Sequence, residues 1–285
     1  MAVRNKSVLI GGGVLALIVF VGLLAPYLGT IDPAQINPAA RNRTPGSEST
    51  VRNADGTRTQ VSHWMGTDSL GRDIYSRVVY GARVSLIVGV SVAIVSASAG
   101  LFIGLLAGYL RWLDGVVMRI MDGLMSIPAI LLAIALVSLA SAGLQTVIVA
   151  IVIPEVPRVV RLVRSVVLSI REEPYVEAAI ALGAPLRVLL ARHVLPNTLA
   201  PLIVQATFVC ASAILVEAIL SFLGIGIPPE IPTWGNIMAQ GRALFRILPH
   251  NILFPGLFLA VTVLAVNMLG DGLRDTLDPR MRRQL

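Results

Sequence analysis

Residues 84–110 read VSLIVGVSVAIVSASAGLFIGLLAGYL, and none of them is Asp, Glu, Lys or Arg. A helix of about 20 apolar residues crosses the ~30 Å hydrocarbon layer of a bilayer, so this segment predicts a transmembrane helix. Within it, Gly100, Gly104 and Gly108 recur at every fourth position and share one helix face. Glycines at this spacing let the backbone of a second helix approach closely. The segment therefore predicts a membrane fold with close helix packing.

The rest of the chain shares this apolar character. Of its 285 residues, 55% are hydrophobic and 14% are charged, and the mean hydropathy is +0.80. These values lie beyond those of an ordinary soluble domain. Several runs of spanning length indicate an all-α, polytopic membrane protein with about six transmembrane helices. The helices are expected near residues 8–28, 84–110, 120–140, 144–165, 198–222 and 251–270.

The chain divides into three parts. Residues 1–30 hold an N-terminal tail and a first span that is longer than the apolar region of a cleaved signal peptide. Residues 31–83 form a polar extracytoplasmic connection, rich in Pro, Asn, Thr, Ser and Gly, which ends in an amphipathic helix near residues 72–79. Residues 84–285 hold the other spans and a cytoplasmic loop, 166–197, that is too charged to lie in lipid.

Basic residues outnumber acidic ones and give a net charge of +7. They punctuate the apolar runs, so they indicate topology signals beside lipid headgroups and no nucleic-acid surface. Their distribution places the N-terminus, the short loop 111–119 and the C-terminal tail in the cytoplasm. Cys210 stands alone in an apolar run, which excludes a disulfide framework. His63, His193 and His250 have no neighbours at ligand spacing, so no metal site is predicted.

The cytoplasmic stretch 174–196 has the pattern of two short helices that meet at a sharp corner. Pro174 suits the first helical position, and Glu177 lies in the first turn, where the helix dipole favours an acid. Gly183 can adopt the left-handed conformation that ends a helix, and Pro185 can begin the next helix. The corner is thin enough to enter a groove on a partner and transmit its motion. The alternative is a loop anchored at the headgroups.

The same stretch carries a sequence signature. EAA at residues 177–179, Gly183 and HVLP at residues 193–196 resemble the EAA motif of bacterial ABC importer permeases, E-A-A-x3-G-x9-I-x-L-P, with His193 in the isoleucine position. RHVLPN at 192–197 is similar to the form common in the peptide and nickel branch. Residues 34–60 match nothing in the family. The segments that resemble the C-type permease of dipeptide, oligopeptide and nickel importers are 66–86, 217–242 and 254–280.

This resemblance implies a type I ABC importer permease in the bacterial cell membrane. Its expected partners are membrane lipid, a second homologous permease, two cytoplasmic ATPases and an extracytoplasmic binding protein, and its expected cargo is short peptides or related small solutes. The sequence lacks G-x-x-x-x-G-K-[ST], G-x-S-x-G and H-E-x-x-H, so ATP and Mg²⁺ are expected on the ATPases, and no cofactor or catalysis is expected here. The resemblance assigns ATPase coupling to Glu177, Ala178, Ala179, Leu182, Gly183, Ala184 and Pro185.

Two other places are candidate sites. Glu217 is a carboxyl group inside an apolar run; it could carry the coupling ion of a secondary transporter, the main alternative, or serve with Ser221 as a structural or gate residue of the path. Trp234, Gly235 and Asn236 lie in a Gly- and Pro-rich segment where they could contact the binding protein, although interfacial anchoring is an alternative for Trp234. A non-transporting scaffold is a weaker alternative function.

Overall fold

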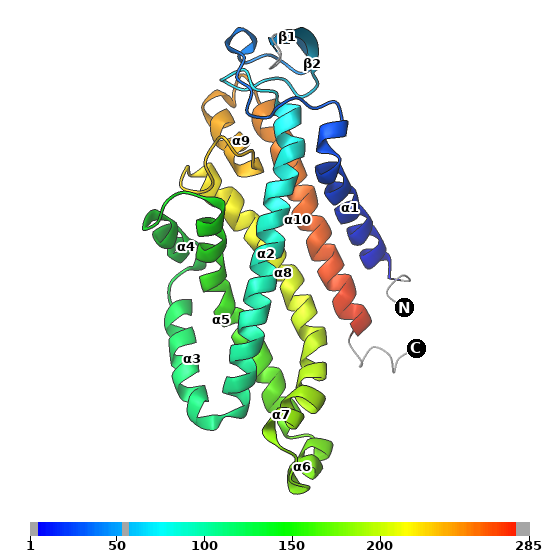
Figure 1. Ribbon diagram of the computed structural model, residues 1–285, viewed down its shortest axis with the longest axis vertical. Coiled ribbons are helices and arrows are strands. Elements are labelled where there is room, and N and C mark those ends of the chain that lie inside the picture. The colour runs from blue at the N-terminus through cyan, green and yellow to red at the C-terminus, as the bar shows by residue number, and fades with distance from the viewer. Residues whose placement is uncertain (1–4, 53–56, 278–285) are drawn as a thin grey trace.

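A computed structural model describes residues 5–52 and 57–277 as a tall helical bundle (Figure 1). A β-hairpin and a short helix cap one end, and another short helix projects from the opposite end. The helices are α1 Lys6–Leu23, α2 Ile74–Tyr109, α3 Arg111–Met125, α4 Ala129–Ser138, α5 Leu144–Arg171, α6 Pro174–Ala181, α7 Leu186–Val188, α8 Leu195–Phe222, α9 Trp234–Gly241 and α10 His250–Leu277. The strands are β1 Ser47–Arg52 and β2 Arg58–His63.

Helix α2 runs the height of the bundle for 36 residues (Figure 1). It begins at Asp73, whose Oδ2 accepts hydrogen bonds from the backbone N–H of Ser76 at 2.7 Å and from its hydroxyl at 2.6 Å. This cap satisfies an otherwise unpaired helix donor. The separate amphipathic helix predicted near 72–79 is therefore wrong, because these residues are the first turns of α2. They also do not lie along a membrane surface, since Ile74 and Arg77 are fully buried.

The glycine face of α2 packs against valines of α5. The sequence predicted that a second helix would approach this face closely. A Cβ added at any of the three glycines would lie only 2.5–2.7 Å from a valine Cβ, closer than real carbon atoms approach. The two backbones therefore meet where only glycine fits. The contacts are Gly100 with Val159, Gly104 with Val163, and Gly108 with Val167.

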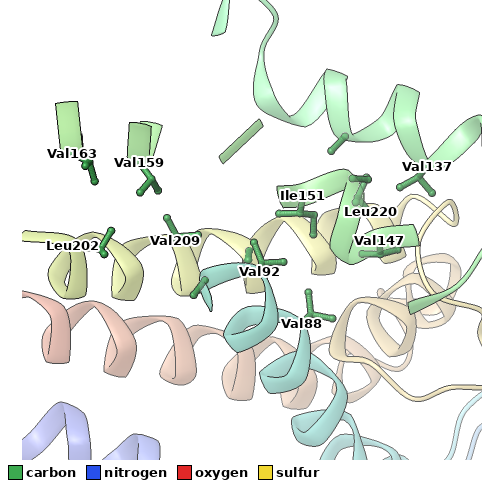
Figure 2. Packing of buried hydrophobic residues seen from close by; sticks show 14 of the residues in the cluster. Val88, Val92, Val137, Val147, Ile151, Val159, Val163, Leu202, Val209 and Leu220 are labelled. Carbon is green, nitrogen blue, oxygen red and sulfur yellow. The ribbon is translucent and has the colours of Figure 1, made fainter. Parts of the chain in front are cut away.

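β-branched side chains fill the main core, which Figure 2 shows from close by. Val88 and Val92 of α2, Ile151 of α5 and Val209 of α8 are buried there together, and α4 adds Val137. Lipid tails are as apolar as these side chains, so close packing holds such helices together more than exclusion of water does.

The number of spanning helices depends on how one broken pair is counted. Four helices of the described chain are long and apolar enough to span a membrane: α1, α2, α10 and the continuous run Leu186–Phe222. That run joins α7 to α8 through a π-helical turn, Leu189–Val194. The pair α3 and α4, bent by 84°, would be a fifth span. Pro128 lies at this bend, where the sequence placed it.

Two predicted boundaries were wrong around the third and fourth spans. Residues 111–119, predicted as a polar loop, form the first half of α3. The fourth span, predicted to end near residue 165, continues as α5 to Arg171, with Arg158, Arg161 and Arg164 inside the helix. Helix α5 has the length of a span but is more charged than the other four.

The polar connection contains regular structure that the all-α prediction missed. Strands β1 and β2 pair antiparallel, with Ser47 opposite His63. The Nε2 of His63 lies 2.7 Å from the hydroxyl of Ser49, and its Nδ1 lies 2.9 Å from Oδ1 of Asp73, the cap of α2. The buried imidazole therefore ties the hairpin to the start of α2. The two strands, SESTVR and RTQVSH, hold one apolar residue each, so no alternation of apolar and polar residues predicts them.

Candidate functional site

The projecting helix α6 is defined at both ends by its sequence. Pro174 occupies the first turn, where its missing N–H costs nothing, and Glu177 lies in the same turn. Gly183 has φ +79°, and its N–H donates to the carbonyl of Ile180 at 2.9 Å. The N–H of Ala184 donates to the carbonyl of Ala179 at 3.0 Å. These two bonds form a Schellman motif, so the predicted left-handed helix end is confirmed.

One side of α6 is anchored and the other is free within the described chain. Val176 is fully buried in the main core, and the Tyr175 ring lies 6.0 Å from that of His193. Glu177 and Ile180 are exposed, and Leu182 is 88% exposed. This tip stands at the far end of the molecule from the hairpin (Figure 1). An exposed apolar side chain at a rigid, protruding corner is a feature of protein contact surfaces.

The cytoplasmic loop predicted at residues 166–197 is shorter in the structure. Helix α5 reaches Arg171, so the corner proper is residues 172–185. Pro185 precedes Leu186, which begins the next helix as predicted. That helix is not a separate short element, because it continues through Leu189–Val194 into α8. The corner therefore joins two long helices directly: α5 on one side and the Leu186–Phe222 run on the other.

Glu217 and Ser221 lie side by side near the end of α8, at the position that the sequence indicated. The Ser221 hydroxyl donates to Oε1 of Glu217 at 2.8 Å, and the Ser85 hydroxyl of α2 donates to Oε2 at 3.4 Å. Glu217 is fully buried and Ser221 nearly so. The carboxyl group thus bridges α2 and α8 inside the protein.

The predicted contact surface at Trp234, Gly235 and Asn236 does not exist in this conformation, because all three residues are buried. Trp234 is 0% exposed, and its indole N–H donates to the carbonyl of Val78 at 3.0 Å. Gly235 packs so closely on the Ala218 carbonyl that a side chain would clash. The proline-rich segment before α9 folds over them, which is why neither docking nor interfacial anchoring fits.

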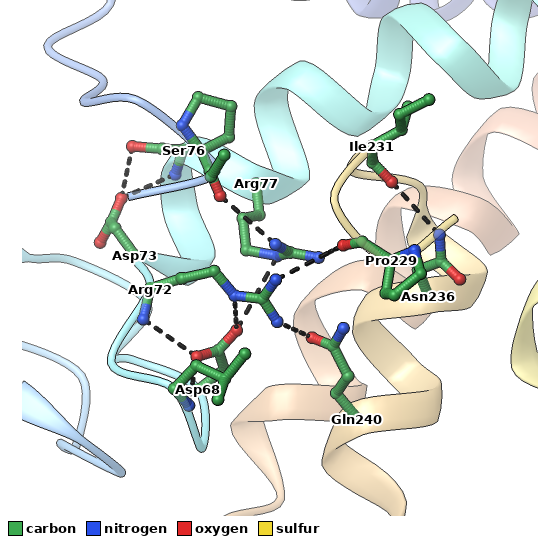
Figure 3. Close-up of polar contacts among 12 residues, drawn as sticks. Asp68, Arg72, Asp73, Ser76, Arg77, Pro229, Ile231, Asn236 and Gln240 are labelled. Carbon is green, nitrogen blue, oxygen red and sulfur yellow. Dashed lines mark hydrogen bonds and ion pairs between the residues drawn. The ribbon is translucent and has the colours of Figure 1, made fainter. Parts of the chain in front are cut away.

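A buried ionic network lies beneath that segment, and the sequence analysis missed it (Figure 3). The Nε of Arg72 donates to Asp68 at 2.7 Å, and its Nη2 donates to Gln240 of α9 at 2.5 Å. The guanidinium of Arg77 donates to the carbonyl oxygens of Pro33 and Pro229, each at 3.3 Å. These contacts tie the polar connection and the segment before α9 to α2. The sequence feature that could have indicated this network is the cluster of charged residues in GRDIYSR, residues 71–77.

A second set of ion pairs lies along α5. The sequence analysis interpreted the arginines of this segment as signals of membrane orientation. Oε1 of Glu155 accepts from the Ser212 hydroxyl of α8 at 2.9 Å, and Oε2 accepts from Arg158 at 3.2 Å. Glu155 is buried between Pro154 and Pro157, inside the helix. Further along α5, the ion pairs with α3 are Arg161 with Asp122 and Arg164 with Asp114.

Comparisons with known proteins agree with this architecture. Residues 100–283 match the family described as binding-protein-dependent transport system inner membrane component. Residues 3–45 match the N-terminal TM domain of oligopeptide transport permease C, so the prediction that residues 34–60 match nothing in the family is wrong for residues 34–45. An inward-facing structure of the MetNI methionine ABC transporter aligns with a TM-score of 0.54 and 22% identity, covering 71% of this chain and 96% of that chain. At this identity the likeness concerns the fold alone.

Similar sequences cover almost the whole chain. A probable peptide ABC transporter permease of Sinorhizobium fredii is 54% identical over 100% of this chain and 92% of its own length. The dipeptide transport system permease DppC of Alkalihalophilus pseudofirmus is 41% identical over 98% and 88%, respectively. The di/tripeptide transport system permease DppC of Pseudomonas aeruginosa is 40% identical over 98% and 90%. The chain therefore belongs to the inner membrane components of binding-protein-dependent ABC transport systems.

Proposed function

We propose that this chain is one of two permease subunits of an ATP-driven importer of short peptides. Its relatives in three organisms are named as peptide, dipeptide or di/tripeptide permeases, which supports this cargo. The proposed assembly contains a second homologous permease, two cytoplasmic ATPases and an extracytoplasmic binding protein. In this proposal the chain binds no cofactor and catalyses no reaction, and ATP with Mg²⁺ is held by the ATPases.

The observation that carries the proposal is the projecting helix α6. Its exposed tip presents Ile180 and Leu182 next to Glu177, a combination that a cleft in another protein would bury. The Schellman motif at Gly183 fixes the direction in which the chain returns.

The connections of α6 give the force a route into the membrane. Only residues 172–173 separate α6 from α5, and only 182–185 separate it from the Leu186–Phe222 helix. Both neighbours belong to the core that packs around α2. A shift of α6 that follows ATPase closure would therefore move two core helices together and change access to the path.

Substitution of Gly183 tests this role. Nothing lies within 4 Å of a Cβ added there, so the obstacle to a side chain is the positive φ and not a clash. Left-handed backbone costs an ordinary residue about 1–2 kcal/mol, more for a β-branched one, whereas Asn tolerates it. We expect Gly183→Val to abolish ATP-driven peptide uptake in proteoliposomes and Gly183→Asn to retain it. Glu177→Lys should also abolish uptake.

The matched control is Gly29→Val, since Gly29 also has a positive φ, +69°, and open space, but precedes the polar connection instead of the corner. All variants should reach the membrane, and only the Gly183→Val and Glu177→Lys proteins should lose co-purifying ATPase. Normal uptake and ATPase binding in both would contradict the coupling role. Uptake that persists without ATP but collapses with an ion gradient would contradict the ABC assignment.

A further inference from the structure

The exposed side chains of the lower half of α5 are all polar. Between Pro157 and Ile170, the exposed positions are Arg158, Arg161, Ser165 and Ser169. Their spacing of three or four residues places them on one helix face, hereafter the polar stripe. The valines of the opposite face are buried against α2. The helix is thus apolar inside and polar outside, as in a protein surface that meets water.

The position of the polar stripe along the bundle can be compared with that of the uncharged segment of α2. Val159 touches Gly100, which lies ten residues, roughly 15 Å, from the end of the uncharged segment of α2 at Leu110. At this level α2 exposes Phe102, which is 67% exposed, whereas α5 exposes Arg158. The other exposed side chains of α2 below its first turns are the apolar Ile87, Val90, Ile94 and Val95 and one small hydroxyl, that of Ser98. Two faces at one depth therefore meet different surroundings.

Lipid does not suit the polar stripe, because a guanidinium in the hydrocarbon layer costs several kcal/mol. The side chains of Arg158 and Arg161 are 51% and 44% exposed. In the described residues Arg158 bonds to Glu155 through Nη1, and Arg161 bonds to Asp122 through Nη2. A guanidinium has five N–H donors, so each arginine keeps donors on its exposed side. Those donors suit a carboxylate, which guanidinium groups bind in a forked geometry.

A hollow continues the polar stripe towards the corner. Ser165 and Ser169 line a cavity of about 900 Å³ between α5, the lower part of α8 and the end of α10. Asn197, Gln205 and Arg274 add further polar groups to its wall. The rest of the wall is apolar and includes Leu162, Val166 and Phe208, so the polar stripe continues into the hollow as a strip of polar groups along one side.

We propose that the polar stripe is a wall of the water-filled translocation path and that Arg158 and Arg161 bind the carboxylate of a passing solute. This inference rests on the transport function proposed above. The arginines bind the carboxylate of a free peptide through these spare donors, while Nη1 of Arg158 stays with Glu155 and Nη2 of Arg161 stays with Asp122, and then release it. Serines further along offer hydroxyl groups to the solute without holding its charge.

Thiol labelling tests the wall without measuring transport. Cys210 is the only cysteine, so a Cys210→Ala protein is a clean background for single cysteines. In reconstituted transporter, with and without ATP, Ser165→Cys and Ser169→Cys should react with two water-soluble methanethiosulfonates, one bearing a sulfonate and one a trimethylammonium. Because Arg161 and Ser165 are one turn apart, the sulfonate should react at least about threefold faster relative to a free thiol than the cation does. Arg161→Gln should remove that preference.

Phe102→Cys is the control on the apolar face: the contacts of Gly100 with Val159 and Gly104 with Val163 put it level with Arg161, one turn from Ser165, and it should react with neither reagent. ATP-driven uptake by each single-cysteine protein is measured separately from labelling. A failure of the proposed transport function is thus distinguished from a failure of the proposal that the polar stripe lines the path. If Ser165→Cys and Ser169→Cys stay unreactive in both nucleotide states, the polar stripe is sealed by protein and the proposal is overturned. Reaction without any charge preference would overturn carboxylate binding.

Discussion

Alanine in place of Gly104 should loosen the contact between α2 and α5. The new Cβ would lie 2.7 Å from the Cβ of Val163 and 3.0 Å from the carbonyl oxygen of Val160. Carbon atoms settle at about 3.5–4.0 Å, so the helices must separate by roughly 1 Å. Overpacking of this size costs about 1–3 kcal/mol of unfolding free energy. A factor of about 5–150 in the folding equilibrium follows from that range.

Gly13→Ala in α1 is the control, because nothing lies within 4 Å of the added Cβ. Both changes gain the same helix propensity, about 1 kcal/mol, so the difference between the two proteins isolates the contact. Unfolding in mixed micelles with a rising fraction of denaturing detergent, followed by circular dichroism, measures it. Adding Val163→Gly to Gly104→Ala moves the small residue to the other helix and should restore part of the loss.

The reasoning fails under two results. Equal stabilities of the Gly104→Ala and Gly13→Ala proteins, within about 0.5 kcal/mol, would mean that the two helices do not meet closely. A double-mutant cycle with no coupling between positions 104 and 163 would mean the same. Either result would also remove the contacts between α2 and α5 from which the depth of the polar stripe is inferred.

Two further predictions concern buried residues. Trp234→Ala should lower the unfolding free energy by about 3–5 kcal/mol, and Trp234→Phe by about 1–3 kcal/mol because the smaller ring leaves space in the core and the indole hydrogen bond to Val78 is lost. Thermal unfolding measures both, and unchanged stability with lost binding-protein affinity would contradict burial. Glu217→Gln should leave ATP-driven uptake largely unchanged, because the amide oxygen still accepts from Ser221 and the amide NH2 can donate to the Ser85 hydroxyl. A folded Glu217→Gln protein without uptake would contradict its structural role.

The sequence predicted those features that depend on local patterns. The uncharged run around Gly104 predicts both a spanning helix and its glycine contact face, because these follow from length and spacing alone. The corner was equally predictable, since Pro174 and Gly183 have conformational preferences that need no tertiary partner. The segments that resemble importer permeases indicated the family from their sequence motifs alone, without knowledge of the contacts that these segments make.

Other features depended on contacts that a sequence does not reveal. Trp234 carries the pattern of an exposed interfacial aromatic, and only the folded segment over α9 shows that it is buried. The arginines of α5 have the spacing of a charged loop next to a membrane, yet Arg161 and Arg164 lie within a helix and pair with Asp122 and Asp114 of the neighbouring α3. Most of the hairpin lies within residues 34–60, where no motif was available, and it ends at His63. In each case the deciding partner lies far away in the sequence.

The unbroken helix from Leu186 to Phe222 has a mechanical consequence. It is roughly 55 Å long, and the buried Glu217 fastens it to α2 roughly 46 Å from the corner. That fastening can act as a fulcrum, with the corner at the end of the long arm. A rotation of about 5° would then swing the corner by roughly 4 Å while the fulcrum stays nearly still. The subunit thereby converts a small angular change at its outer end into a wide stroke beneath the membrane, or the reverse.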